Sequence, residues 1–300
     1  MSRIHEALKK AEEEKRFRGV PEAVEAPSAN PAVVQAAVAS EWPALAGGNG
    51  GGLPGHEMLE RCARRTWNPD QRTMLFFGQQ EQSVFSEGFR TLRSRLTQVR
   101  EKQPLKRLLI SSALPGEGKT FVSANLAQAL VRQKGHRVLL IDADLRLPQV
   151  HTALGAPAAP GLSDYLRGKA DEFSILQHGP LENLFFIPGG STVSDPAELV
   201  ASPKLKLLLD RMSPCFDWVI LDSPPVVPVA DASILAGLCD GVVLVVEAAS
   251  TPVEMAQKAR HEFRDRQILG VVLNRVHPRD SYGSYAYYSL YGRNGKKPTK

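Results

Sequence analysis

The sequence is poor in cysteine and has no long hydrophobic run. Its three cysteines, Cys62, Cys215 and Cys239, lie far apart and form no CxxC pair, which argues against a disulfide framework and favours a reducing compartment. The strongest apolar run, 242–246, has the length of a strand and falls far short of the roughly 18 residues that span a bilayer. The N-terminus carries no apolar signal region. We therefore expect a cytoplasmic protein that is recruited to a membrane only by a partner.

Histidine spacings typical of metal sites are also missing, as are patterns typical of specific nucleic-acid binding. The seven histidines are scattered, and none has the spacing of a metal-ligand set. The net charge of +5 is not gathered in one block, so it fits weak attraction to acidic partners or anionic lipid and predicts no specific nucleic-acid site. Apolar residues make up 43% of the 300 residues, which is enough for one sizeable domain with extensions.

Composition divides the chain into four parts. Residues 1–18 have the pattern of a charged amphipathic helix, which is either solvated or docks on a protein partner or a membrane surface. Residues 19–80 are predicted to be a flexible linker, because most of the segment is Ala-, Pro- and Gly-rich and cannot bury enough apolar surface to offset its ordering entropy; within it, 57–80 are ambiguous. A folded domain is predicted over 81–276 and a tyrosine-rich tail over 277–300.

Short apolar segments alternate with helical periodicity throughout the predicted domain. Strands are predicted at 107–112, 138–141, 184–187, 218–221, 242–246 and 268–273. Helices are predicted from about 83 and over 119–134, 162–167, 197–212 and 253–266. Nearly all-apolar strands that are separated by helices indicate a mostly parallel, doubly wound α/β sheet covered on both faces. The loops after such strands gather at one edge, where ligands bind.

A glycine-rich loop, Ala113-Leu-Pro-Gly-Glu-Gly-Lys-Thr120, joins the first of these strands to the next helix. This context makes it a phosphate-binding loop and the domain a P-loop NTPase fold, with Ala113 where the general pattern has glycine. Lys119 is expected to contact the β- and γ-phosphates of ATP, and Thr120 to ligate Mg²⁺. The residues expected to bind nucleotide here are Pro115, Gly116, Glu117, Gly118, Lys119, Thr120 and Phe121.

Carboxylates follow two further strands. Asp142 and Asp144 come just past the strand at 138–141, and Asp222 ends the strand at 218–221. Acidic groups beside a phosphate site must hold a cation or take a proton, so Asp144 and Asp222 are expected to support Mg²⁺ with Thr120. All three aspartates and Lys119 are candidate catalytic residues, and the residues alone do not decide whether Asp142 or Asp144 is the base. Asn274, at the end of the last strand, either reaches the adenine base or is an ordinary turn residue.

Tyrosine is concentrated at the C-terminal end of the chain. Five of the six tyrosines lie in the last nineteen residues. They are Tyr282, Tyr285, Tyr287, Tyr288 and Tyr291. A tyrosine cluster that follows an ATP site favours an enzyme that phosphorylates its own tail. The alternative is a disordered end that uses its aromatic and basic residues for adhesion or for stacking on single-stranded nucleic acid.

These motifs together resemble the bacterial tyrosine kinases of capsular and exopolysaccharide synthesis, the BY-kinases, over about residues 82–291. The resemblance rests on the phosphate loop, on Leu-Ile-Asp-Ala-Asp-Leu-Arg-Leu-Pro at 140–148, on Val-Ile-Leu-Asp-Ser-Pro-Pro at 219–225, on Asp-Pro-Ala-Glu-Leu-Val-Ala-Ser at 195–202 and on the tail. It implies that Asp142 assists the acceptor. The helix with Glu87, Arg90 and Arg93 matches the family's ExxRxxR pattern, which the resemblance implies is a subunit contact.

The same resemblance implies a split cytoplasmic form of the kinase, and the N-terminal extension resembles the form that accompanies exosortase loci. It further implies a membrane chain-length-determinant protein as activator, a homo-oligomeric ring, possibly an octamer, and a tyrosine phosphatase that resets the tail. The nearest rival is a non-kinase switch ATPase of the partitioning or septum-site type, whose phosphate loop has an extra lysine where this chain has Leu114. A second rival is a degenerate ATPase that only binds and regulates a polysaccharide polymerase or chain-length controller.

Overall fold

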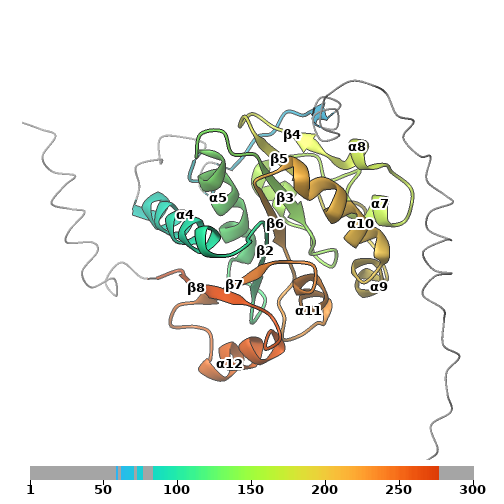
Figure 1. Cartoon of the computed structure of the whole chain (residues 1–300). Helices are drawn as coiled ribbons and strands as arrows, with labels where there is room; N and C mark the ends of the chain where they lie inside the picture. The colour runs from blue at the N-terminus through green and yellow to red at the C-terminus, as the bar shows by residue number, and fades with distance from the viewer. Residues whose placement is uncertain (1–58, 60–61, 71–72, 77–83, 277–300) are drawn as a thin grey trace, which may run out of the picture. The chain divides into compact units, whose positions relative to one another are not determined.

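The computed structural model of the chain describes residues 59, 62–70, 73–76 and 84–276 (Figure 1). All of these described residues belong to one compact unit. The predicted N-terminal helix and the five tail tyrosines lie outside the described residues. No helix within the described ranges combines the length and apolar character needed to cross a membrane.

One eight-stranded sheet forms the centre of the unit, in the order β1-β4-β5-β3-β6-β2-β7-β8. All pairings are parallel except that between β4 and β5. Its strands are β1 (Ala63–Arg64), β2 (Arg107–Ser112), β3 (Val138–Asp142), β4 (Gln177–His178), β5 (Leu184–Ile187), β6 (Trp218–Asp222), β7 (Gly241–Glu247) and β8 (Ile268–Asn274). The predicted mostly parallel sheet is confirmed.

Helices cover both faces of this sheet (Figure 1). They are α4 (Val84–Lys102), α5 (Lys119–Val131), α6 (Val150–Leu154), α7 (Leu162–Leu166), α8 (Glu172–Ile175), α9 (Pro196–Val200), α10 (Pro203–Met212), α11 (Asp231–Ala236) and α12 (Val253–Glu262), with a 3₁₀ turn, η2, at Ser213–Cys215. Alternate strand residues enter two cores. Leu108 and Ile110 pack with α4 and α5, whereas Leu109 packs with α10 and α11.

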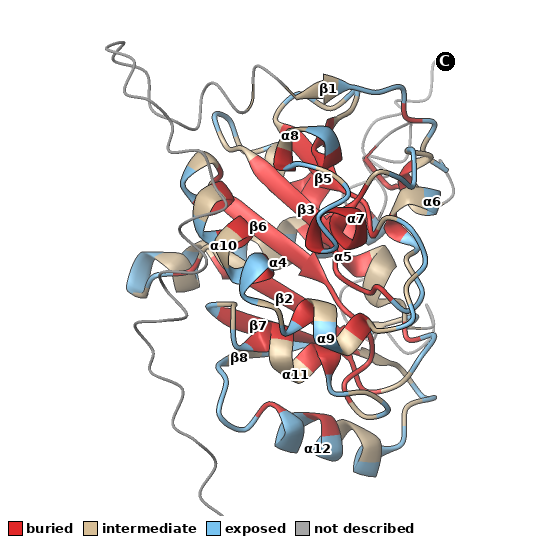
Figure 2. Ribbon diagram, turned by 90° about the vertical axis from the view of Figure 1, so that its right-hand side faces the viewer, coloured by how far each residue is buried: buried red, intermediate tan, exposed pale blue. Residues whose placement is uncertain are grey.

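The central strands β2, β3, β5, β6 and β7 are buried along most of their length, whereas the edge strand β8 and the outer surfaces of the helices are partly exposed (Figure 2). Helix α5 is the exception, because every residue from Val122 to Leu130 is buried between the sheet and α4. The helix that follows the phosphate loop is thus fixed on all sides. This burial gives the loop a rigid support at its C-terminal end.

Helix boundaries differ from the predicted ones where proline intervenes. The single helix predicted over 197–212 is two helices, α9 and α10, because Ser202 precedes Pro203 and adopts an extended conformation with ψ 145°. The helix predicted over 253–266 ends at Glu262, and that over 119–134 ends at Val131. The short helices α6, α8 and α11 and the antiparallel strand β4 lack a periodic pattern long enough to be predicted.

The folded unit also begins earlier than predicted. Trp67, Met74, Leu75 and Phe76 are buried in the core that contains α5, although they fall in the predicted linker of 19–80. The Trp67 ring meets that of Phe186 edge-on at 6.0 Å between centroids. The linker boundary at residue 80 is therefore wrong, because a few large apolar side chains dock a segment whose overall composition does not predict a core.

We expect Trp67→Ala to lower the free energy of unfolding by about 3–5 kcal/mol. The substitution removes a buried aromatic side chain that packs against Phe186 of β5, and it leaves a cavity there. Denaturant unfolding measures this effect. The exposed neighbour variant Arg65→Ala serves as the control and should change stability little. Equal stability of the two variants would contradict the placement of this segment in the core.

Candidate active site

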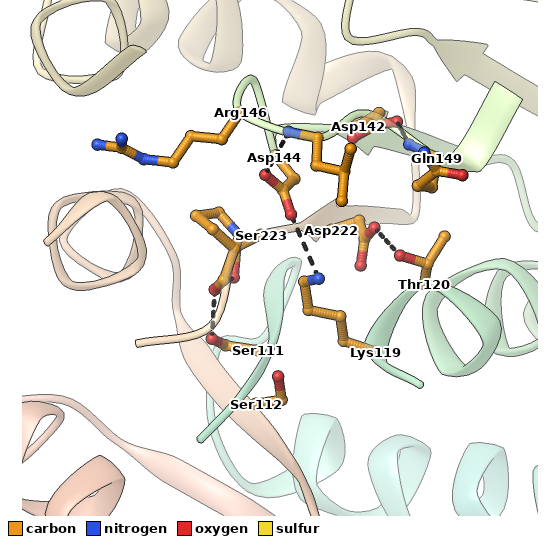
Figure 3. A network of polar contacts seen from close by, with 12 residues as sticks. Ser111, Ser112, Lys119, Thr120, Asp142, Asp144, Arg146, Gln149, Asp222 and Ser223 are labelled. Carbon is orange, nitrogen blue, oxygen red and sulfur yellow. Dashed lines mark hydrogen bonds and ion pairs between the residues drawn. The ribbon is translucent and has the colours of Figure 1, made fainter. Parts of the chain in front are cut away.

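The ends of three neighbouring strands bring the site together. In the sheet β6 lies between β3 and β2, so the phosphate loop after β2 lies beside Asp222 at the end of β6, and Asp142 at the end of β3 lies next along. Asp142 and Asp222 are direct cross-strand partners. Figure 3 shows the side chains from all three strand ends converging around Lys119. The sequence order of the motifs alone does not give this adjacency, which comes from the strand order.

The phosphate loop itself is held in a curled conformation. Gly116 and Gly118 adopt φ of 84° and 90°, in the left-handed region that favours glycine. The carboxylate of Glu117 accepts a hydrogen bond from the backbone N–H of Leu114 at 2.7 Å, which closes the loop on itself. Pro115 and Gly116 are exposed at the tip, whereas Glu117 is buried. The loop therefore presents main-chain groups rather than side chains at its tip.

Asp222 is fully buried, and hydrogen bonds to both of its oxygens stabilise its charged form. Its two oxygens accept hydrogen bonds from the hydroxyls of Thr120 at 2.8 Å and Ser123 at 2.7 Å. Burial raises the pKa of Asp222 to about 6, while the charge of Lys119 and the two hydroxyl hydrogen bonds act to lower it. Ser123 was not identified from the sequence as a residue of this site. It lies three residues after Thr120 on α5, a spacing that places both hydroxyls on one helix face.

Asp144 is engaged by the phosphate-loop lysine. Its Oδ2 lies 3.2 Å from Nζ of Lys119, and its Oδ1 accepts the backbone N–H of Leu147 at 3.1 Å (Figure 3). Both side chains are largely buried. In this structure the ammonium group thus lies between the phosphate loop and a carboxylate, where it neutralises one of the three acidic groups.

Asp142 is the least compensated of the three aspartates. Its Oδ2 accepts the backbone N–H groups of Gln149 and Val150, each at 3.0 Å, whereas its buried Oδ1 has no hydrogen-bond partner. Burial raises the pKa of Asp142 well above its ordinary value, and the charge of Asp222 adds to this shift, against the lowering effect of the Val150 N–H. A buried carboxylate with one unpartnered oxygen is chemically suited to accept a proton.

An ion pair outside the predicted set supports this loop. The guanidinium of Arg146 makes two hydrogen bonds to the carboxylate of Asp231 at the start of α11, at 2.8 and 2.9 Å. Asp231 is buried, and Arg146 is partly exposed. The pair fixes the segment between Asp144 and Gln149, and so helps to hold the two backbone N–H groups against Asp142. No pattern in the sequence indicates this pairing, because 85 residues separate its partners.

The side chains of two predicted nucleotide contacts, Phe121 and Asn274, have partners within the chain. The Phe121 ring packs edge-on against Phe89 of α4 at 5.8 Å between centroids, so any nucleotide contact by Phe121 would come from its main chain. The side-chain amide of Asn274 donates to the backbone carbonyl of Glu117 at 2.8 Å, which places it directly on the phosphate loop. Its contact with adenine stays a prediction.

The predicted oligomer residues lie on α4, away from the carboxylates. Glu87 and Arg90 form an ion pair of 2.8 Å and are partly exposed. Arg93 instead donates to the backbone carbonyl of Ala129 at 2.8 Å and thereby ties α4 to α5. Arg93 has a structural role within the chain, and its subunit contact stays a prediction, as do the acceptor tyrosines, which lie outside the described residues.

The chemistry of these groups fits a magnesium nucleotide. Mg²⁺ prefers oxygen donors, and Thr120, Asp144 and Asp222 present hydroxyl and carboxylate oxygens beside the loop. The curled loop before α5 supplies main-chain N–H groups and the positive end of a helix dipole. Lys119 can exchange its carboxylate partner for a phosphate oxygen. The arrangement can therefore hold a nucleoside triphosphate beside Asp142, whose second oxygen has no hydrogen-bond partner.

We expect Asp142→Asn to stabilise the protein free of nucleotide and metal at pH 8, by on the order of 1–3 kcal/mol, the usual cost of an unsatisfied buried polar group. Since the pKa of Asp142 is raised on folding, the native state binds more protons than the unfolded chain above about pH 3.8, and stability falls as pH rises. Removing the carboxyl should flatten this fall. Part of the slope should remain, because the pKa of Asp222 is also raised.

Thermal unfolding in EDTA between pH 5 and pH 8 measures this difference. Asp144→Asn is the matched control, because it removes a partner of Lys119 and should not stabilise the protein. An Asp142→Asn variant that is less stable than the wild type at pH 8 would show that the Asp142 charge is compensated after all.

Known proteins share both the sequence and the fold of this chain. Residues 108–288 match the model of the CobQ/CobB/MinD/ParA nucleotide-binding domain. The chain is 37% identical over 207 residues to the tyrosine-protein kinase YwqD of Bacillus subtilis, which covers 68% of this chain and 87% of that protein. It is 32% identical over 216 residues to the putative tyrosine-protein kinase CapB of Staphylococcus aureus, covering 71% of this chain and 94% of CapB.

A solved structure extends this likeness to the fold. The crystal structure of the chimerical protein CapA2B2 superposes with a TM-score of 0.65 at 30% identity, over 69% of this chain and 92% of that one. The part of this chain that matches the family model, residues 108–288, includes the phosphate loop, Asp142, Asp144 and Asp222. The chain belongs to the bacterial tyrosine-protein kinases, built on a CobQ/CobB/MinD/ParA nucleotide-binding fold, and is a protein-tyrosine kinase.

Proposed function

We propose that this kinase transfers the γ-phosphate of ATP to the tyrosines of its own C-terminal cluster. The acceptors are Tyr282, Tyr285, Tyr287, Tyr288 and Tyr291. The observation that carries the proposal is the buried Asp142 carboxylate with one unpartnered oxygen at the edge of a phosphate site. In a tyrosine kinase whose last nineteen residues hold five tyrosines, that oxygen provides a proton acceptor for a phenol.

The chain's own residues divide the work of binding and charge neutralisation. Lys119 and the amides of the phosphate loop hold the phosphates, and Thr120, Asp222 and Asp144 supply oxygen ligands for the metal. Magnesium, when bound, would neutralise phosphate charge and draw electrons from the transferred group. Phosphoryl transfer depends mainly on such positioning and neutralisation, so a rigid α5 behind the loop serves the reaction directly.

The geometry favours Asp142 over Asp144 as the base. Asp144 is committed to Lys119 through Oδ2 and to the Leu147 N–H through Oδ1, whereas Asp142 keeps one oxygen without a partner. A free tyrosine hydroxyl has a pKa of about 10, so it needs a base as the new bond forms. The raised pKa of Asp142 brings it closer to that of the phenol and makes proton transfer less unfavourable.

The proposed cycle links phosphorylation to assembly. Subunits would associate in a ring, possibly an octamer, through α4 with its Glu87, Arg90 and Arg93, and the tail of one subunit would reach the site of a neighbour. Each phosphate adds roughly −1.5 to −2 charges, so a modified tail would favour dissociation. A tyrosine phosphatase would reset the tail. A membrane chain-length-determinant protein would recruit and activate the cytoplasmic kinase, and the cycle would regulate exopolysaccharide polymerisation and export.

We expect intact-mass spectrometry after incubation with Mg²⁺ and ATP to show multiple additions of phosphate, which peptide mapping places between Tyr282 and Tyr291. Lys119→Ala should abolish the additions because it removes the cation that faces the phosphates. Lys258→Ala, an exposed position on α12, is the control and should behave as the wild type. ATP turnover by the wild type without added mass would instead support a switch ATPase.

We expect the phosphorylated protein to sediment as smaller species than the unmodified protein at the same concentration, because like charges gather at the subunit contacts. Analytical ultracentrifugation at low and high salt measures this shift, and screening by salt should weaken it. Phosphatase treatment should restore the larger species. A fully phosphorylated sample that stays as oligomeric as the unmodified one would contradict the proposed cycle.

A further inference from the structure

The Glu117 side chain in the phosphate loop turns away from the side where phosphate would bind. Only 3% of Glu117 is exposed, and its carboxylate is shared between two partners. One oxygen accepts the Leu114 N–H at 2.7 Å, and the other accepts the hydroxyl of Thr251. Glu117 stands between the two left-handed glycines, so this anchor fixes the part of the loop with the greatest conformational freedom.

Thr251 belongs to the turn that follows β7. Its hydroxyl accepts the backbone N–H of Glu247 at 3.0 Å and donates to the Glu117 carboxylate. The hydroxyl hydrogen therefore points at Glu117 because its oxygen is already oriented by the end of β7. A carboxylate and an oriented hydroxyl make a stronger hydrogen bond than two neutral groups.

Asn274, the last residue of β8, contacts the same part of the loop from the neighbouring strand. Its side-chain amide donates to the backbone carbonyl of Glu117 at 2.8 Å, and its own carbonyl accepts the Ala248 N–H at 2.9 Å. A Cβ atom on Gly118 would overlap the Asn274 amide nitrogen, so the glycine permits this close approach. Glu117 is thus held from both strands, at its side chain by Thr251 after β7 and at its backbone carbonyl by Asn274 of β8.

This contact determines where the peptide N–H points. In a planar trans peptide the carbonyl and the N–H of one unit point in opposite directions. Since the Glu117 carbonyl is bonded to Asn274, the Gly118 N–H is directed away from β8. Gly118 immediately precedes Lys119, where α5 begins and where the positive end of the helix favours phosphate.

We propose that Asn274 and Thr251 are positioning residues that hold the Glu117–Gly118 peptide in its phosphate-binding orientation. If either contact is lost, the loop populates other conformations, and the apparent affinity for phosphate falls with the fraction that remains competent. By reciprocity, phosphate binding stiffens the ends of β7 and β8.

The experiment separates positioning from direct recognition of adenine. Calorimetric titration of the full chain with ADP and with inorganic pyrophosphate, both with Mg²⁺, gives the affinity with and without a base. Asn274→Leu removes the amide donor with similar size and adds no charge, and Thr251→Val removes the hydroxyl. We expect each variant to weaken both ligands by the same factor, about five- to ten-fold, as for the loss of one hydrogen bond.

Controls on the same elements keep the result specific. Thr251→Ser retains the hydroxyl and should restore wild-type affinity, and Val271→Ala changes an exposed side chain on β8 and should have no effect. Hydrogen exchange of peptides that span 245–252 and 268–276 should show protection by Mg-ADP in the wild type and not in Asn274→Leu.

Three results would overturn the proposal. Weaker ADP binding with unchanged pyrophosphate binding in Asn274→Leu would make Asn274 an adenine contact instead. Unchanged affinity for both ligands in both variants would show that the loop needs no such support. An equal loss in Val271→Ala would indicate a general effect of the strand. These measurements involve no phosphoryl transfer, so a kinase that fails to modify its own tail would leave their outcome unaffected.

Discussion

Two carboxylates in register on neighbouring strands, Asp142 on β3 and Asp222 on β6, set the constraint that governs this site. Both are almost completely buried, and burial disfavours the charged form of each. The sheet cannot separate them, because the pairing of β3 with β6 fixes their spacing. The surroundings therefore decide which of the two is stabilised as an anion.

The hydrogen bonds and charges that stabilise the three carboxylates are unequal, and this inequality supports the proposed division of roles. Asp222 receives two hydroxyls from α5 and the nearby charge of Lys119, whereas Asp142 receives two backbone N–H groups on one oxygen only. Asp144 takes the Lys119 ammonium group. The unsatisfied Asp142 oxygen lowers the stability of the fold, and the packing of the two cores on either side of the sheet offsets this loss. Such local instability is typical of functional sites.

The phosphate loop is supported from several sides, and each support comes from a different element. α5 is buried along its length behind the loop, and Asp222 holds its first turn through Thr120 and Ser123. On the other flank the ends of β7 and β8 fix Glu117 through Thr251 and Asn274. A loop built around two left-handed glycines would otherwise sample many conformations, so these contacts supply the preorganisation that its sequence lacks.

The sequence predicted the strands well because they are continuous apolar runs, and β2 and β5 have the bounds that were predicted. It predicted the motif residues Lys119, Asp142 and Asp222 because strand, loop and helix signals coincide there. It did not predict contacts between distant segments, such as Arg146 with Asp231 or Thr251 with Glu117. These depend on strand order and side-chain packing, which no local pattern encodes.

The predicted start of the folded core was wrong for a related reason. Trp67 and Phe76 lie in a short segment without helical or strand periodicity, so their docking is decided by the complementary surface of the core rather than by the segment itself. The break between α9 and α10 at Ser202–Pro203 could have been predicted, because a proline disfavours the helical conformation of the residue that precedes it. Composition over long windows conceals both kinds of local event.

We propose that Asp142 accepts the phenolic proton, whereas Asp144 binds Lys119 and the metal. The most direct test is single-turnover phosphoryl transfer to tyrosine by Asp142→Asn and Asp144→Asn, with Mg-ATP affinity measured in parallel. We expect Asp142→Asn to lose transfer, by about 10²-fold or more, with near-normal affinity, and Asp144→Asn to lose affinity as well. Normal transfer by Asp142→Asn would contradict it.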